Sequence, residues 1–251
     1  LKEAFEGNQT LFSGLWLHDN WDWEKHYPVV HISFAEGVLK SRDELDKRIR
    51  DLLYQNQTAL GVECRQPNDI PGYFGELIRN SAKKYNLRTV ILIDEYDKPI
   101  LDNIVEPQIA KEMRDGLKNL YSVIKGQDAN IEFALLTGVS KFSKVSLFSG
   151  LNNLTDITLD PKYSTICGYS ETELATVFSN HLENKPIEDI RKWYNGYSWL
   201  GQRVYNPFSI LNYLRTGRFL NFWFETGTPE FLIKLVLSGR YYIPGLEDAV
   251  A

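Results

Sequence analysis

An unbroken apolar run, Thr89-Val-Ile-Leu-Ile-Asp94, passes directly into acidic residues and constrains the fold more than any other segment. A run of this kind, rich in β-branched side chains and without polar alternation, is typical of a central parallel strand covered on both faces. Because parallel strands need a crossover connection, usually a helix, the run predicts βαβ units.

Strand-like and helix-like segments alternate on either side of this run. Three more segments are expected to be strands: Pro28–Phe34 and Ile131–Thr137, both buried, and the shorter Asp156–Leu159. Helices are expected at Leu1–Leu17 (ending near Gly14), in the stretch that Ser41 caps, at residues 71–86 and at Pro107–Lys125. The alternation predicts an α/β fold with a parallel sheet flanked by helices.

The pattern changes in the last third of the chain, where helices dominate. Ser170-Glu-Thr-Glu173 fits an N-terminal capping box, Asn195-Gly196 between aromatic residues is a tight-turn signal, and Asn206-Pro207 starts another helix. We therefore expect an α/β core over residues 1–165 and a mostly helical subdomain over residues 166–251.

The bulk composition limits the classes of partner. With 28 Lys and Arg against 33 Asp and Glu, the formal net charge of −5 argues against non-specific binding to nucleic acid or anionic lipid. The two cysteines, Cys64 and Cys167, form no CxxC or His-spaced group, so neither a disulfide framework nor a structural zinc site is expected. No run is apolar enough to span a bilayer and no signal peptide is visible, so we expect a cytoplasmic protein without membrane contact.

Two adjacent carboxylates, Asp94 and Glu95, stand at the carboxyl end of the expected central strand, where ligands bind in open α/β sheets. A nucleoside triphosphatase needs such a pair, the first acid for the magnesium shell and the second to polarise the attacking water. Alternatively, the acids have no catalytic role and stand there only because the position after a buried strand is the first one exposed to water. For Asp97 we favour a structural role, as a cap of the next turn or in a surface pair with Lys98.

A second polar strand end, Thr137-Gly-Val-Ser-Lys141, follows the strand expected before it. If the two strands are neighbours, Thr137 lies beside the acidic pair and its hydroxyl can sense a terminal phosphate. Otherwise it bonds its own loop, which the spacing alone favours. The phosphate-binding run G-x-x-x-x-G-K-[ST] is absent, because Gly138-Val-Ser-Lys141 lacks the spacing and no lysine follows Gly72–Gly75.

Three segments together resemble a known family. They are Leu92-Ile-Asp-Glu-Tyr-Asp97, the stretch from Leu136 to Leu154, and Trp193-Tyr-Asn-Gly-Tyr197 with Val204-Tyr-Asn-Pro207. The set is similar to the AAA-ATPase-like family of bacteria and archaea, whose members often carry a C-terminal PD-(D/E)XK nuclease-like domain. The resemblance runs over nearly the whole chain. It implies a P-loop-NTPase-like sheet, a helical lid, and ATP and magnesium as cofactors.

The resemblance also implies roles for individual residues. Asp94 matches the acid that holds magnesium, and Glu95 the acid that activates water. Thr137 lies where a sensor residue would sit. Lys141 and Lys144 are candidates for a contact with phosphate or a partner. The arginine finger stays open among Arg114, Arg191 and Arg203.

The part of the family pattern that should precede Leu1–Asn8 is missing. The resemblance implies that the first strand and the phosphate-binding loop have been lost upstream, by truncation or by true loss, from this chain, which starts without Met. It also implies that the chain does not extend far enough to hold the nuclease-like domain. Because that strand would be central, a gap with unpaired backbone groups is expected in the sheet. We expect this chain alone to bind ATP weakly or not at all. The aromatic turn Trp193–Tyr197 is expected to form a structural hairpin with a packed base.

Two functions stay open from the sequence. In the first, the intact protein is an ATP-dependent switch whose lid relays the nucleotide state to a C-terminal effector. Its expected partners are the nucleotide, further copies of itself, and nucleic acid only through that effector. In the second, the chain is a non-catalytic scaffold that binds partners through an aromatic surface. A nuclease activity of its own is not expected, since Glu183-Asn-Lys185 matches E-x-K without a paired Asp on an upstream strand.

Overall fold

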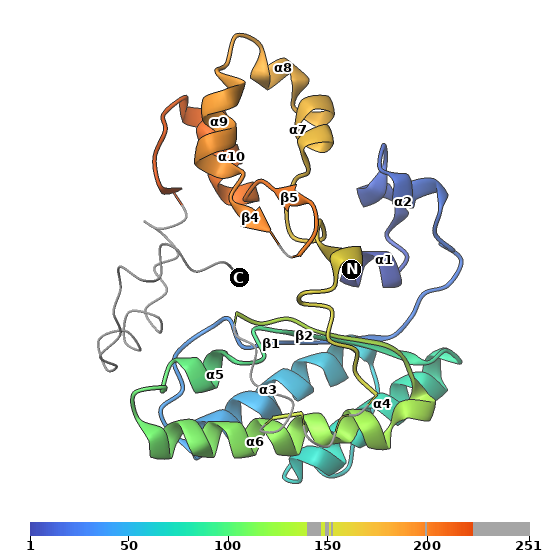
Figure 1. The fold of residues 1–251 in the computed structure, drawn as a ribbon. Coiled ribbons are helices and arrows are strands. Elements are labelled where there is room, and N and C mark those ends of the chain that lie inside the picture. The colour runs from blue at the N-terminus through green and yellow to red at the C-terminus, as the bar shows by residue number, and fades with distance from the viewer. Residues whose placement is uncertain (140–146, 149–150, 152, 199, 223–251) are drawn as a thin grey trace. The chain divides into compact units, whose positions relative to one another are not determined.

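The computed structural model describes residues 1–139, 147–148, 151, 153–198 and 200–222. Contacts divide the chain into two compact units, one built on Leu1–Asn153 and the other beginning at Leu154 (Figure 1). The domain boundary expected near residue 165 stays a prediction.

The first unit is built on a three-stranded parallel sheet in the order β1-β2-β3. The strands are β1 (Val29–Ser33), β2 (Thr89–Asp94) and β3 (Ile131–Leu136). The α/β class and the parallel sheet flanked by helices are thus confirmed. The strand expected at Asp156–Leu159 is wrong, because that segment runs as loop and turn.

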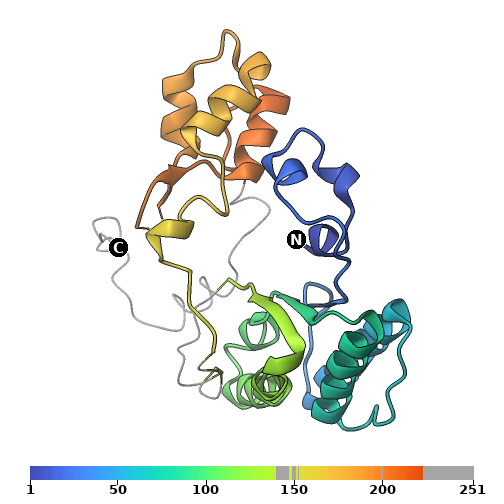
Figure 2. The same cartoon turned by 90° about the vertical axis from the view of Figure 1, so that its right-hand side faces the viewer.

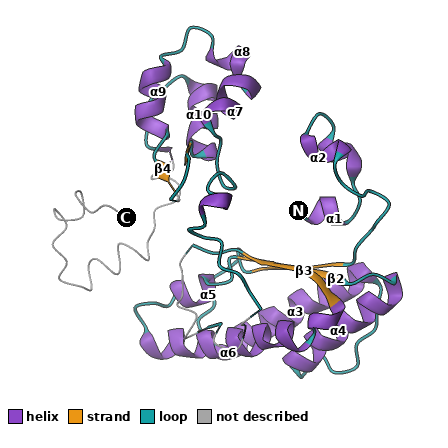
Figure 3. Ribbon diagram, turned by 45° about the vertical axis from the view of Figure 1, so that its right-hand side comes forward, coloured by secondary structure: helices purple, strands orange, loops and turns teal. Residues whose placement is uncertain are grey.

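Four helices lie on one face of this sheet (Figures 1 and 3). They are α3 (Arg42–Leu60), α4 (Ile70–Tyr85), the short α5 (Lys98–Leu101) and α6 (Pro107–Gly126). As predicted, Ser41 caps α3, where its hydroxyl accepts the Glu44 N–H at 3.2 Å. A one-turn 3₁₀ segment, η2 (Asp128–Asn130), leads from α6 into β3.

The opposite face of the sheet carries the start of the chain. The single helix expected over Leu1–Leu17 is wrong: the segment consists of α1 (Lys2–Phe5), η1 (Gln9–Phe12) and α2 (Trp16–Asp19). Gly7 and Gly14 interrupt it with φ of 85° and 79°, in the left-handed region that a continuing helix does not use. The Phe5 ring fills the face by packing on an apolar cluster: Val29, Val90, Leu92, Leu135, Trp21 and Tyr27.

The two edges of the sheet differ. At the β1 edge the side-chain amide of Asn56 accepts the His31 N–H and donates to the His31 carbonyl, both at 2.8 Å, and so occupies the strand edge. At the other edge, β3 is only half-covered, and Phe133 is 37% exposed. The prediction that β3 is buried is therefore wrong. Within the described part, β1, β2 and β3 pair in unbroken succession, so the expected gap does not lie between them.

Helices are the main regular elements of the second unit in its described part (Figure 2, yellow to orange). Its elements are η3 (Pro161–Tyr163), α7 (Glu171–Val177), α8 (Ser179–Leu182), α9 (Ile187–Tyr194), β4 (Tyr197–Ser198), β5 (Arg203–Val204) and α10 (Pro207–Thr216). The capping box at Ser170 is confirmed, and Asn206 caps α10 through the Ser209 N–H at 2.9 Å. Its core is aromatic and aliphatic: Leu174, Ile190, Tyr194, Tyr205, Ile210 and Tyr213.

The aromatic hairpin exists, but its turn was misplaced. β4 and β5 pair in antiparallel fashion through Tyr197↔Val204 and Ser198↔Arg203, so the chain reverses between residues 198 and 203. Asn195 is the C-cap of α9 with φ of −91° and ψ of 64°, and therefore lies before the hairpin. The Asn-Gly pair joins helix α9 to strand β4. In sequence, a turn of this kind looks the same as the reversal of a hairpin.

Candidate functional site

At the carboxyl ends of the three parallel strands, a polar side chain is either the last residue of the strand or directly follows it. Ser33 is the register partner of Asp94, and Thr137 directly follows Leu136, the register partner of Ile93. Alternation along each strand places these three side chains on the face that Phe5 covers further back. The carboxyl edge therefore carries a row of hydroxyl, carboxylate and hydroxyl groups, one from each strand.

The Thr137 hydroxyl is bonded to the Asp94 carboxylate. Its Oγ1 donates to Asp94 Oδ1 at 2.6 Å, and the Glu95 N–H donates to the same oxygen at 3.1 Å. The backbones are tied as well, since the Thr137 N–H donates to the Ile93 carbonyl at 2.9 Å. The structure thus brings the predicted sensor and the predicted magnesium ligand together. The hydroxyl bonds the neighbouring strand instead of its own loop, against the alternative that spacing favoured.

Two hydrogen bonds fix the orientation of the exposed Asp94 carboxylate through Oδ1. Among the described residues, nothing donates a hydrogen bond to Oδ2. A carboxylate held by one oxygen and open at the other fits one ligand position of a hydrated magnesium ion. Mg²⁺ binds proteins through one or two carboxylates and keeps several of its waters.

Glu95 has an unusual backbone. Its φ of 52° lies in the left-handed region, which costs a residue with a Cβ roughly 1–2 kcal/mol. Such strain persists only where the surrounding structure enforces it, and it gathers at functional sites. Burial, and next the Asp94 charge, raise the pKa of the half-buried Glu95 carboxyl, whereas Lys98 acts in the opposite direction.

Asp97 is fully buried, so the expectation of a surface pair with Lys98 is wrong. Its Oδ1 accepts the Val139 N–H at 3.2 Å, across the gap between the ends of β2 and β3. A Cβ at Gly138 would lie 2.6 Å from the same oxygen, so this position requires glycine. Asp97 therefore fixes the path of the chain directly after Thr137.

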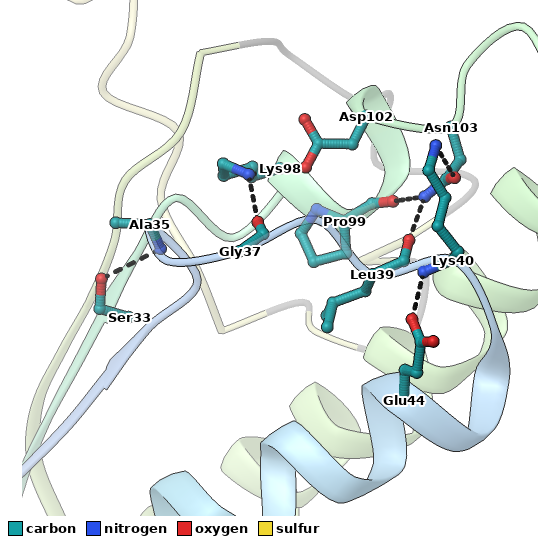
Figure 4. A network of polar contacts seen from close by, with 10 residues as sticks. All are labelled: Ser33, Ala35, Gly37, Leu39, Lys40, Glu44, Lys98, Pro99, Asp102 and Asn103. Atoms are coloured by element: carbon teal, nitrogen blue, oxygen red, sulfur yellow. Dashed lines mark hydrogen bonds and ion pairs between the residues drawn. The ribbon is translucent and has the colours of Figure 1, made fainter.

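The loop that follows β1, residues 34–41, is held against α5 and the residues after it (Figure 4). Lys98 Nζ donates to the Gly37 carbonyl at 2.8 Å and pairs with Asp102 at 2.6 Å. Asn103 Nδ2 donates to the Leu39 carbonyl at 2.7 Å and to the Pro99 carbonyl at 2.9 Å. The loop that follows Ser33 is thereby hydrogen-bonded to the segment that follows Asp94 and Glu95.

The remaining predicted residues fall in different places. Lys141 and Lys144 lie outside the described residues. Arg191 forms a two-pronged bond to Glu171 and pairs with Glu188, and Arg114 pairs with the adjacent Asp115. Arg203 lies in β5 with an exposed side chain.

Sequence reasoning did not single out Ser33. Its signal is present, because the apolar run Val29–Ser33 ends in a polar residue as Thr89–Asp94 does. The pairing that sets Ser33 opposite Asp94 is a tertiary fact that the run does not contain.

Residues 1–148 match a family model for AAA-ATPase-like proteins, described as "Predicted AAA-ATPase". The chain is 52% identical over 251 residues to an uncharacterised protein in the vnfD 5′ region of Azotobacter chroococcum mcd 1, and it spans only 48% of that protein. No solved structure matches. None of the helices in the described part combines the length and apolar character needed for a membrane crossing.

Proposed function

Because the chain belongs to the predicted AAA-ATPase family, we propose that it is the nucleotide-responsive part of a longer ATP-dependent switch. The observation that carries this proposal is the 2.6 Å hydrogen bond between Thr137 and Asp94 at the carboxyl edge of two adjacent parallel strands. Ligands of open α/β sheets bind in the crevice outside this edge.

In the proposed site Asp94 contributes to the magnesium shell and Thr137 senses the terminal phosphate. The ion, when bound, neutralises charge that develops on the transferred phosphoryl group. The hydroxyl of Thr137 holds the carboxylate in one orientation before the ion arrives. A phosphate oxygen would compete with Asp94 for the Thr137 hydroxyl proton. Binding of the phosphate would therefore weaken the hydrogen bond to Asp94 and free its carboxylate.

Glu95 is proposed to polarise the attacking water. A carboxylate whose pKa lies above its ordinary value is a better proton acceptor near neutral pH, and burial and Asp94 shift Glu95 in that direction. Its left-handed backbone departs from the extended backbone of β2, and we propose that this departure lets two adjacent residues serve one site.

The remaining parts of the proposed ATPase are expected outside the three strand ends that carry Ser33, Asp94 and Thr137. The chain spans about half of its curated relative, so the phosphate-binding loop and a C-terminal nuclease-like effector are proposals for the longer protein. Nucleic acid would be reached only through that effector, and other copies of the chain are proposed partners. We also propose a cytoplasmic location and a phosphate or partner contact for Lys141.

The proposal is tested by titrating a fluorescent ATP analogue with magnesium into this chain and into an extended form that includes the sequence encoded upstream of Leu1. We expect tight binding only in the extended form, and loss of that binding in Asp94→Ala. Tight magnesium-dependent binding by the chain alone would overturn the expectation that this chain binds ATP weakly or not at all. Absence of binding in both forms would favour a scaffold.

The scaffold is the second candidate, and one observation favours it. Apolar side chains at the start of the chain are strongly exposed: Trp16 by 74%, Leu11 by 64% and Leu15 by 58%. Exposed apolar groups that gather on one segment are typical of protein contacts. If this function holds, Trp16→Ala weakens partner binding while Asp94→Ala leaves it unchanged, as measured by pull-down with the tagged chain.

A further inference from the structure

Ser33 completes the row of polar groups at the carboxyl edge of the sheet. It stands opposite Asp94 in the register of β1 and β2, on the side of β2 away from Thr137. Asp94 is thus flanked by a hydroxyl on each side. The two hydroxyls differ in their hydrogen bonds, because the Thr137 hydroxyl already donates its proton to Asp94 at 2.6 Å.

The Ser33 hydroxyl has a proton available. Its Oγ accepts the Ala35 N–H at 3.3 Å, and among the described residues it donates no hydrogen bond (Figure 4). The side chain is half-buried, so it is open to a ligand or to water. A hydroxyl both accepts and donates, so the bond from Ala35 leaves the proton free.

The loop that follows Ser33 is itself held in place. Lys98 and the buried Asn103 bond the carbonyls of Gly37 and Leu39 at 2.8 Å and 2.7 Å, which ties residues 34–41 down within a few residues of Ser33 (Figure 4). A group held in place by its supporting contacts binds a ligand at a lower entropic cost than a mobile one.

We propose that Ser33 is a further positioning residue of the magnesium site, and that it holds a water of the ion's hydration shell beside Asp94. The inference rests on the proposed ATPase function. Magnesium releases its waters reluctantly, so a site with one carboxylate depends on groups that hydrogen-bond those waters. Partners of this outer kind typically change metal affinity by about 10- to 100-fold when they are removed.

The test is the magnesium dependence of ATP hydrolysis by the extended form, with Ser33→Ala, Ser33→Thr, Asp94→Ala and Ser122→Ala compared. Ser122 is an exposed serine on α6 and serves as the matched control. We expect Ser33→Ala to raise roughly tenfold the magnesium concentration for half-maximal binding of a fluorescent ATP analogue and for half-maximal turnover, and to regain the native rate at saturating magnesium. Ser33→Thr, which keeps the hydroxyl, should restore the native dependence.

The outcomes separate this inference from the proposal beneath it. If Asp94→Ala abolishes turnover while Ser33→Ala leaves the magnesium dependence unchanged, the role of Ser33 is overturned and the ATPase proposal stands. If Ser33→Ala lowers turnover equally at every magnesium concentration, the residue has a structural role and the inference also fails. If Asp94→Ala is without effect, both are overturned.

Discussion

At the scale of single residues, the hydrogen bond between Thr137 and Asp94 is the contact on which the proposed nucleotide site rests. Valine has nearly the shape of threonine but cannot donate a hydrogen bond. We predict that Thr137→Val lowers ATP turnover of the extended form by about tenfold, since a charge-assisted hydrogen bond contributes roughly 1.5–3 kcal/mol. Steady-state kinetics will measure this, and Thr137→Ser, which keeps the hydroxyl, should stay near the native rate. Equal turnover by both variants would exclude the sensor role.

The pKa shift of Glu95 leads to a prediction about stability. Burial and Asp94 raise its pKa above the ordinary 4.5, so ionised Glu95 disfavours folding. Below that value the group is protonated in both states and costs nothing, whereas the cost is fully present above the raised pKa. We predict that Glu95→Gln raises the melting temperature at neutral pH and that the gain vanishes as the pH falls below 4.5. Thermal melts from pH 4 to pH 8 check this, and a pH-independent gain would contradict it.

The candidate site could be predicted from sequence only in part. Asp94 and Thr137 were expected to meet if β2 and β3 were neighbours, and the pairing meets that condition. The buried place of Asp97 and the alignment of Ser33 were not foreseen. Both depend on which strand lies beside which, and hydrophobic patterns along one strand carry no such information.

At the scale of elements, Asn56 protects the edge of β1 by bonding both backbone groups of His31 at 2.8 Å. Asn56→Ala leaves these groups without a protein partner. We predict a loss of about 1–2 kcal/mol in the free energy of unfolding, together with a greater tendency to aggregate through the exposed edge. Urea denaturation and light scattering measure the two effects. Gln55→Ala, at an exposed position on the same helix, is the control, and a matching loss there would discount the role of Asn56.

The buried Asn103 links the loop at residues 34–41 to α5. Its amide serves the carbonyls of Leu39 and Pro99, and its oxygen accepts from Lys40 Nζ at 3.2 Å. We predict that Asn103→Ala costs about 2 kcal/mol in the free energy of unfolding, since the buried Pro99 carbonyl and the half-buried Leu39 carbonyl lose their donor. The exposed Asn119→Ala should stay within about 0.5 kcal/mol of the native chain. Chemical denaturation decides, and an unchanged midpoint for Asn103→Ala would show that the loop is held by other means.

Elements whose signals are local were predicted well. The bounds of β2, the Ser41 cap and the capping box at Ser170 follow from side chains within a few residues. The long helix expected at Leu1–Leu17 failed because Gly7 and Gly14 adopt left-handed backbone. The prediction that β3 is buried failed for a different reason. Apolar residues such as Phe133 predict that a strand is covered, but they do not show which segment covers it.

At the scale of the whole molecule, the half-covered β3 edge is where we expect a further strand of the longer protein to pair. Asn56 bonds the outward backbone groups of His31 at the β1 edge, so among the described strands we expect a further strand to pair beside β3. We predict that backbone amides within Ile131–Leu136 exchange more slowly in the extended form than in this chain. Hydrogen–deuterium exchange measures the difference, with β1 amides as the internal reference. Equal exchange of β3 in both forms would place the added segment elsewhere.

The central claim is that the acidic pair belongs to a working ATPase site, and single-turnover hydrolysis by Glu95→Gln in the extended form tests it most directly. Glutamine keeps the shape of the side chain but cannot accept the proton of the attacking water. We predict that the variant binds magnesium and ATP as the native form does, while hydrolysis slows by about 10²- to 10⁴-fold. Hydrolysis at the native rate would contradict the account.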